Sequence, residues 1–165
     1  MKNKFITILL MGVAGAGKTT VGKVLTDKIN GYFIEADDFH GENNIKKMSA
    51  GFPLNDDDRY DWLIKIKNEI LKRKAKQNLI VACSSLKEKY RELLGIGNYK
   101  LVFLKVDKLT AKNRINSRDD HFMPETLVDS QFSILEEPEN ALVFEQSLNQ
   151  DQIVNEIIKQ LKIVI

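Results

Sequence analysis

A glycine-rich stretch near the start of the chain has the spacing of a phosphate-binding loop (P-loop). Residues 12–19 read GVAGAGKT and match the pattern G-x-x-x-x-G-K-[ST]. Glycines let successive backbone N–H groups converge on one anion, and a following helix adds its positive dipole end. Lys18 would then reach the outer phosphates, and Thr19 would offer a hydroxyl to Mg²⁺. The sequence therefore predicts a bound nucleoside triphosphate with Mg²⁺, with nucleotide contacts at Gly12, Gly15, Ala16, Gly17, Lys18, Thr19 and Thr20.

Two acidic side chains follow the next strand-like run. Glu35 and Asp37 lie at i and i+2, and on an extended segment such side chains point the same way, whereas Asp38 would point away. Opposite the P-loop, Glu35 would hold Mg²⁺ and Asp37 would accept a hydroxyl proton. An acidic turn in solvent is the structural alternative, and the P-loop favours the functional one.

Cationic and hydroxyl side chains later in the chain are candidates for binding substrate. Arg59 stands at the start of a predicted helix, where its planar fork suits a carboxylate or a phosphate. Ser84 and Ser85 follow a strand-like run, and they either bind a polar substrate or cap the next helix; the sequence leaves both open.

Arg114 and Arg118 are four residues apart and so lie on one face of a predicted helix. The polar residues 119–124 come directly afterwards. Arginines that enter such a segment are typical of a lid that closes over phosphates and excludes water, with ordinary surface arginines as the alternative. We expect the lid at about residues 116–135.

The elements that must position these residues alternate along the chain. Strands are expected at 5–11, 32–36, 79–83, 100–106 and 141–144. Helices are expected at 18–29, 57–76, 86–94, 108–117, 125–136 and 149–162. Continuous apolar strands between helices indicate an α/β fold with a parallel sheet covered on both faces. Ligands of such sheets lie beyond the carboxyl ends of the strands, where the candidate residues stand.

Length and composition favour a single domain over residues 1–165. A net charge of +2 gives no argument for a nucleic-acid partner, and no apolar run approaches the roughly 18 residues of a membrane span. Residues 1–11 are interpreted as a core strand rather than a signal peptide. Cys83 is the single cysteine, so no intramolecular disulfide can form, and we expect a cytoplasmic protein.

Four other features are interpreted as structural. Asp107 follows a strand like a metal-binding aspartate, but a helix N-cap is favoured there. Cys83 is expected to be a buried thiol. The basic residues 72–76 are expected to end a helix rather than to bind nucleic acid, and the apolar positions of 153–161 to form the buried stripe of a terminal helix.

Several motifs together resemble the small bacterial-type gluconate kinases, over about residues 5–140. They are the P-loop, Asp37-Asp-Phe-His40, Asn44-Ile-Lys-Lys-Met48, Pro53-Leu-Asn-Asp-Asp-Asp-Arg59, Trp62-Leu63, Cys83-Ser-Ser-Leu-Lys87, Tyr90-Arg91, His121-Phe-Met123 and Ser130-Gln-Phe-Ser-Ile-Leu-Glu136. The resemblance implies a three-layer P-loop kinase fold, with a five-stranded parallel sheet in the order 2-3-1-4-5, a mobile lid and often a homodimer.

The resemblance also implies phosphorylation of D-gluconate at its 6-hydroxyl by ATP. Lys18, Asp37 and Arg118 would be the catalytic residues, and Arg114 would stack on adenine. The carboxylate of such an acceptor needs a cation and its hydroxyls need hydrogen bonds, so the candidate acceptor contacts are Asp37, His40, Arg59, Ser84, Lys87 and Arg91. Ala16, Glu35 and Asp120 depart from the residues frequent at these positions, which are serine, aspartate and glycine.

Three alternatives are weighed against this function. Shikimate or a nucleoside monophosphate could be the acceptor of a kinase with the same fold. A GTP-dependent switch or binding module would be supported by a guanine-reading Asn-Lys-x-Asp motif, which the chain lacks. A P-loop ATPase that drives an assembly would need a firm metal-binding acid after a strand, and Asp107 is a poor candidate.

Overall fold

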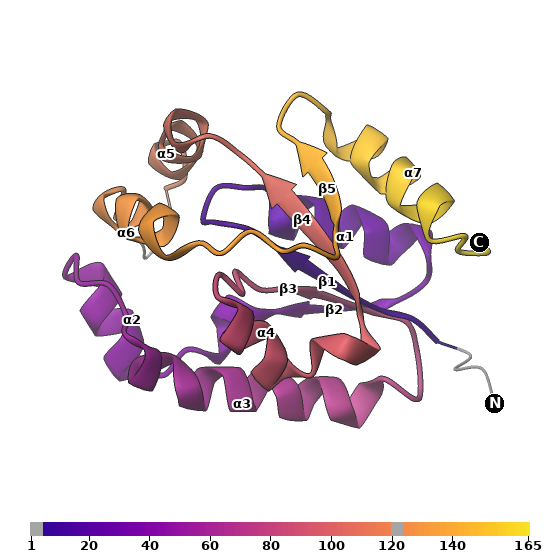
Figure 1. Ribbon diagram of the computed structural model, residues 1–165, viewed down its shortest axis with the longest axis horizontal. Coiled ribbons are helices and arrows are strands. Elements are labelled where there is room, and N and C mark those ends of the chain that lie inside the picture. Colours follow the sequence, from indigo (N-terminus) through magenta and orange to yellow (C-terminus); the bar gives the residue numbers. More distant parts are fainter. Residues whose placement is uncertain (1–4, 120–123) are drawn as a thin grey trace.

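The computed structural model describes residues 5–119 and 124–165, which contain one parallel sheet between layers of helices (Figure 1). The strands are β1 (Thr7–Met11), β2 (Tyr32–Glu35), β3 (Leu79–Ala82), β4 (Lys100–Lys105) and β5 (Leu142–Glu145). Their order across the sheet is β2-β3-β1-β4-β5, and every neighbouring pair is parallel. The predicted sheet and strand order are confirmed.

Helices connect these strands and cover the sheet. The α-helices are α1 (Lys18–Lys28), α2 (Glu42–Ser49), α3 (Asp56–Arg73), α4 (Glu88–Leu94), α5 (Lys108–Asn116), α6 (Thr126–Ile134) and α7 (Gln150–Gln160). Two 3₁₀ helices are η1 (Ala36–Phe39) and η2 (Ile96–Asn98). Within the described ranges no helix is both long and apolar enough to cross a membrane.

The central strands are apolar throughout because both of their faces are covered. Every residue of β1 and β3 is buried, and successive side chains alternate between the two faces of the sheet. Leu9 and Val81 pack with residues of α3 and α4 on one face. Ile8, Leu10 and Ile80 pack with residues of α1 and α7 on the other. Figure 1 shows these two helical layers on opposite sides of the sheet.

A third apolar cluster lies beyond the carboxyl ends of the strands. It joins the P-loop to α2, α5 and α6 through Val13, Met48, Ala111, Leu127 and Val128, all of which are buried. In Figure 1 these three helices gather at the end of the sheet to which the strands point. The cluster therefore forms the frame around the edge where the sequence predicts the site.

Side-chain caps define the starts of three helices. The capping box of α3 pairs Asn55 with Asp58, so the run of aspartates before Arg59 serves the helix start. Asp107 caps α5 by accepting from the N–H of Thr110 at 2.7 Å, which confirms the structural interpretation of this residue. Asn149 caps α7 in the same way as Asn55 caps α3.

The other structural interpretations also agree with the structure. Cys83 is buried, and burial raises the pKa of its thiol to about 11, so it is not a nucleophile at neutral pH. Ile153 and Ile157 of α7 are buried in the layer that covers α1. Arg73, in the last turn of α3, forms an ion pair with Glu69, and its guanidinium lies 3.8 Å from the centre of the Tyr32 ring.

The helix α2 and the turn η1 were not predicted. In α2 only Ile45 and Met48 are large apolar residues, and no side chain caps its first turn, so the sequence carries little helical signal. Residues 35–38 were expected to be extended. Residues 36–39 form η1 instead, which changes the geometry on which the prediction for Asp37 and Asp38 was based.

Gly22 of α1 marks a close contact between this helix and the sheet. A Cβ atom at Gly22 would lie 2.4 Å from the Phe33 ring and 3.3 Å from Leu10 Cδ1. We therefore expect Gly22→Ala to lower the free energy of unfolding by about 1–3 kcal/mol, although alanine favours helices. Urea unfolding monitored by circular dichroism measures the change. Gly97→Ala is the control, because a Cβ there meets no atom within 4 Å. Equal or higher stability of Gly22→Ala would contradict the prediction.

Candidate active site

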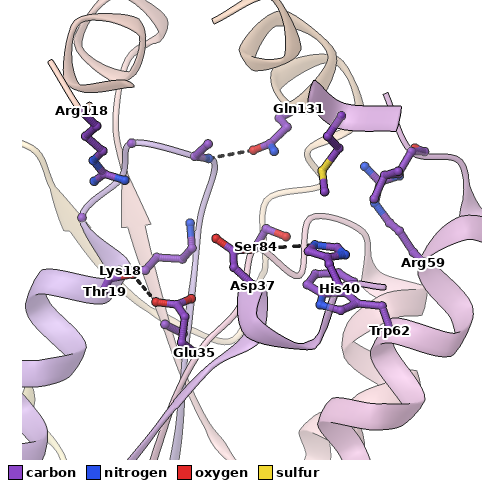
Figure 2. A pocket seen from close by; sticks show the side chains of 16 residues that line it. Lys18, Thr19, Glu35, Asp37, His40, Arg59, Trp62, Ser84, Arg118 and Gln131 are labelled. Carbon is purple, nitrogen blue, oxygen red and sulfur yellow. Dashed lines mark hydrogen bonds and ion pairs between the residues drawn. The ribbon is translucent and has the colours of Figure 1, made fainter. Parts of the chain in front are cut away.

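A pocket opens at the carboxyl ends of β1, β2 and β3 (Figure 2). It encloses about 660 Å³, part of which is open to solvent. Ten of the residues predicted from sequence line it: Gly15, Gly17, Lys18, Thr19, Glu35, Asp37, His40, Arg59, Ser84 and Arg118. The fold thus brings side chains from distant parts of the sequence to one cavity.

Lys18 starts α1 and lies at the floor of the pocket. Its Nζ donates to the carbonyl oxygens of Gly12 and Val13 at 3.0 and 2.9 Å. Burial lowers the pKa of Lys18, and the carboxylates of Asp37 and Glu35 oppose that shift. An anion in the pocket would stabilise the ammonium form, so the arrangement suits phosphate.

Positive φ angles and, at Gly15, close backbone approach require the glycines of the P-loop. Gly15 has φ +82°, and a Cβ there would lie 2.6 Å from the Ala111 carbonyl oxygen at the start of α5. Gly17 has φ +92° and precedes the first turn of α1. Gly12, Ala16 and Thr20 shape the loop and helix without lining the pocket, and their predicted contacts with nucleotide stay predictions.

Thr19 and Glu35 meet at the junction of α1 and β2. The Thr19 hydroxyl donates to Glu35 Oε2 (Figure 2). Burial raises the pKa of Glu35, while the hydrogen bond from Thr19 lowers it. A hydroxyl and a carboxylate are hard oxygen donors of the kind that Mg²⁺ takes alongside phosphate oxygens and water, so the pair fits the predicted metal. Among the residues that the structure describes, no group of three or more His, Cys, Asp or Glu side chains could hold a metal ion. The pair would therefore need phosphate oxygens and water as further ligands.

Asp37 faces the pocket for a reason different from the one expected. The extended geometry predicted for residues 35–38 is wrong, because the chain turns into η1 directly after Glu35. The turn directs Asp37 into the pocket, where 47% of its side chain is exposed, and leaves Asp38 outside the lining. Figure 2 shows Asp37 in the middle of the cavity, facing Lys18.

His40 lies beside Asp37 on a rigid aromatic support. The ring stacks on Trp62, with centroids 4.2 Å apart and an interplanar angle of 12°. The Trp62 indole N–H donates to the carbonyl of Ala36 at 2.7 Å, which fixes the support to η1. His40 Nε2 lies 4.0 Å from Asp37 Oδ1. Burial lowers the pKa of His40 to about 4, so the imidazole is neutral at pH 7.

Arg59 occupies the wall opposite Lys18 and Arg118 (Figure 2). The residue is only 9% exposed. Its Nη1 donates to the carbonyl of Leu54 and, at 3.3 Å, to the hydroxyl of Tyr90. A buried guanidinium at the edge of a cavity provides further N–H groups for an anion.

Ser84 lines the pocket, and the structure excludes one of its two predicted roles. The helix α4 begins at Glu88, its N-cap is Lys87, and no side chain caps it, so the capping alternative is wrong for Ser84 and Ser85. The Ser84 carbonyl accepts from the N–H of Gly12 at 3.2 Å and so ties the end of β3 to the P-loop. The hydroxyl of Ser84 belongs to the pocket wall (Figure 2).

The two arginines expected in or near a lid lie beside the P-loop. Arg114 Nη1 donates to the carbonyl of Gly15 at 3.1 Å. Arg118 follows the end of α5 and lines the pocket. Of the predicted lid, residues 120–123 lie outside the described residues, and with them Asp120 and the His121 motif. The rest of the lid contains α6, whose Leu127 and Val128 are buried.

Lys87 and Arg91 do not reach this pocket. Lys87 Nζ lies 3.1 Å from Asp56 Oδ1 at the start of α3. Arg91 is buried and donates to the carbonyl of Ser85 at 2.8 Å, and it faces a separate acidic groove. Their predicted contact with substrate therefore has no support from the geometry.

Sequence reasoning did not assign a role to Gln131, which also lines the pocket. The residue is buried on α6, and its Oε1 accepts from the N–H of Ala14 in the P-loop at 2.7 Å (Figure 2). The sequence did contain a signal for a role of Gln131, because an amide side chain stands on the apolar side of a helix, four residues after Leu127. Such a residue needs a buried hydrogen-bond partner, which here is the loop.

Comparison with known proteins identifies the family of the chain. The family model described as shikimate kinase matches residues 14–162. A protein named "Probable gluconokinase" from Saccharomyces cerevisiae is 43% identical over 148 residues, which cover 82% of this chain and 77% of that protein.

Solved structures give the same result. The chain is similar to a sugar kinase from Janibacter sp. HTCC2649, with 33% identity and a TM-score of 0.87, over 97% of this chain and 96% of that one. It is also similar to a gluconokinase from Sinorhizobium meliloti 1021, with 35% identity and a TM-score of 0.83, over 95% of this chain and 91% of that one.

The environment of His40 predicts an unusual titration. An unperturbed histidine titrates near pH 6.5, whereas His40 should stay neutral until the pH approaches about 4. Because the unfolded state then binds the proton first, His40 should reduce stability as the pH falls from about 6.5 towards 4. Two-dimensional ¹H–¹⁵N spectra of the imidazoles between pH 4 and 8 test this, with His40→Gln to assign the signals. A midpoint of 6.5 or above for His40 would contradict it.

Proposed function

The chain belongs to the gluconokinases within the shikimate kinase family, and we propose that it transfers the γ-phosphoryl group of ATP to the 6-hydroxyl of D-gluconate. One observation carries the proposal. Lys18 and Arg118 lie on one side of a single pocket, while Asp37 and Arg59 face them from the centre and the far wall (Figure 2). This arrangement offers cations to phosphates and a proton acceptor to a hydroxyl within the same cavity.

The nucleotide would bind along the P-loop and the start of α1. Backbone N–H groups and the helix dipole attract the phosphates, and Lys18 can exchange its two carbonyl partners for phosphate oxygens. Arg114 donates to the Gly15 carbonyl beside the loop, and we expect it to contact adenine. Arg118 would neutralise charge on the transferring group.

Mg²⁺ would be held by Thr19 and Glu35 together with phosphate oxygens and water. When bound, the ion neutralises charge on the phosphates and fixes their orientation. A cation at this place would favour the ionised form of Glu35 and so oppose the rise in pKa that burial causes.

Phosphoryl transfer itself requires few covalent roles from the protein. The 6-hydroxyl oxygen forms a bond to the γ-phosphorus, and the bond from that phosphorus to the bridging oxygen of ADP breaks. The hydroxyl proton passes to Asp37, which lies opposite Lys18 in the pocket. Because the transition state is loose, positioning and charge neutralisation supply most of the catalysis.

The acceptor would lie between Asp37 and Arg59. The buried fork of Arg59 suits the carboxylate of gluconate. The imidazole of His40 is neutral, so it would hydrogen-bond a sugar hydroxyl without adding charge to the pocket. Ser84 adds a further hydroxyl to the wall.

A cytoplasmic location suits an enzyme supplied with ATP, and we include it in the proposal. The homodimer that the resemblance implies stays a prediction. Size-exclusion chromatography with light scattering would decide it.

An acceptor survey tests the function. We expect ADP release from ATP·Mg²⁺ in the presence of D-gluconate, with a new phosphomonoester signal in ³¹P spectra of the product. Parallel reactions contain shikimate, other aldonates or nucleoside monophosphates. Turnover that is fastest with one of these, or that needs no acceptor, would overturn the assignment of gluconate.

Asp37→Asn tests the proton acceptor. Asparagine keeps the size of the side chain but is a much weaker base, so kcat should fall by about 10²- to 10⁴-fold. The KM for ATP should hardly change, because in this mechanism Asp37 acts on the acceptor hydroxyl. Asp38→Asn is the matched control, since Asp38 lies outside the pocket lining. Retained activity in Asp37→Asn together with loss in Asp38→Asn would reassign the base.

A further inference from the structure

The guanidinium of Arg59 is held from behind by two hydrogen bonds through one nitrogen. Nη1 donates to the carbonyl of Leu54 and to the hydroxyl of Tyr90 at 3.3 Å. The guanidinium carbon also lies 5.5 Å from the centre of the Tyr90 ring. A guanidinium has five N–H donors. Contacts at one nitrogen therefore leave the N–H groups of the other two nitrogens for an anion.

Tyr90 can accept from Arg59 because its own proton is committed elsewhere. The Tyr90 hydroxyl donates to Asp56 Oδ1 in the first turn of α3. The residue is only 4% exposed, and burial, together with the bond to Asp56, raises the pKa of Tyr90, which keeps the proton in place. The lone pair of the hydroxyl is therefore directed at Arg59.

Asp56 is kept ionised by neighbouring lysines. Lys89 and Lys87 both donate to its carboxylate, the latter at 3.1 Å, and with Tyr90 they hold the pKa of Asp56 well below its usual range. Lys87, which sequence reasoning assigned to the substrate, thus contacts the carboxylate behind Tyr90. The ionised carboxylate of Asp56 can only accept hydrogen bonds. Tyr90 therefore donates to Asp56 and accepts from Arg59.

We propose that Asp56 and Tyr90 are positioning residues, which orient the guanidinium of Arg59 so that its free N–H groups meet the carboxylate of the acceptor. The inference rests on the proposed function. It assigns specificity for an acidic acceptor to a relay of three side chains, Asp56, Tyr90 and Arg59, that joins α3 to α4. A loosely held arginine would lose more conformational entropy on binding the same carboxylate.

A purely structural role for the relay makes a different prediction. If Tyr90 only packs α4 against α3, its removal should act independently of Arg59 and should affect all substrates alike. If it acts through Arg59, its effect should be confined to the acceptor and should vanish when Arg59 is absent. A double-mutant cycle separates these cases.

The experiment compares Tyr90→Phe, Arg59→Ala and the double variant by steady-state kinetics with D-gluconate and ATP. Phenylalanine keeps the ring and removes only the hydroxyl. We expect Tyr90→Phe to raise the KM for gluconate about three- to tenfold, because the guanidinium is still present but less well oriented, with an unchanged KM for ATP and kcat. In the Arg59→Ala background, Tyr90→Phe should produce no further change.

Asp56→Asn gives a second test that keeps the Tyr90 ring and hydroxyl. It should also raise the KM for gluconate, whereas Asp57→Asn, an exposed residue of the same helical turn, should not. Equal effects of the Asp56 and Asp57 variants, or additive effects of Tyr90→Phe and Arg59→Ala, would overturn the inference alone. No turnover of gluconate by the unaltered protein would overturn the proposed function and the inference with it.

Discussion

Burial of the central strands on both faces is the constraint on which the rest of the molecule depends. β1 and β3 have no exposed position, so they cannot carry charged groups along their length. The groups capable of chemistry therefore stand just after the strands: Lys18 beyond β1, Glu35 and Asp37 at and after the end of β2, and Ser84 after β3. Backbone hydrogen bonds between parallel strands fix the positions of these ends relative to one another and need no contact between side chains.

The pocket combines groups that burial drives towards their neutral forms. The pKa values of Lys18 and His40 are lowered and that of Glu35 is raised, each mainly by removal from water. A bound polyphosphate favours the charged form of Lys18, and a bound cation favours ionised Glu35. The proposed nucleotide and cation would each supply the counter-charge that one of these buried protein groups lacks.

Sequence reasoning was most successful where one pattern has one physical solution. The apolar run before the P-loop and the glycine spacing within it are compatible only with a strand, a tight loop and a helix, and these are what the chain forms. Periodicity located α7, and the N-cap residue Asp107 located the start of α5. Such signals are local, so they survive without knowledge of the tertiary structure.

The remaining features depend on contacts between distant segments. Asp37 was correctly directed into the pocket, but from an extended geometry that the η1 turn replaces. Helix α2 was missed because it has few apolar positions and contributes Met48 to a cluster that only the folded chain creates. Lys87 and Arg91 were assigned by charge type, whereas their partners, Asp56 and the Ser85 carbonyl, follow from how α3 and α4 pack.

The two outer strands have a consequence for behaviour at high concentration. β2 and β5 each pair on one side only, and each is four residues long. Such short edges expose few unpaired peptide groups, and Arg73 covers the ring of Tyr32 at the start of β2. Edge-to-edge addition of one sheet to another is the first step in many forms of protein aggregation. The edges of this sheet offer few unpaired peptide groups for such an addition.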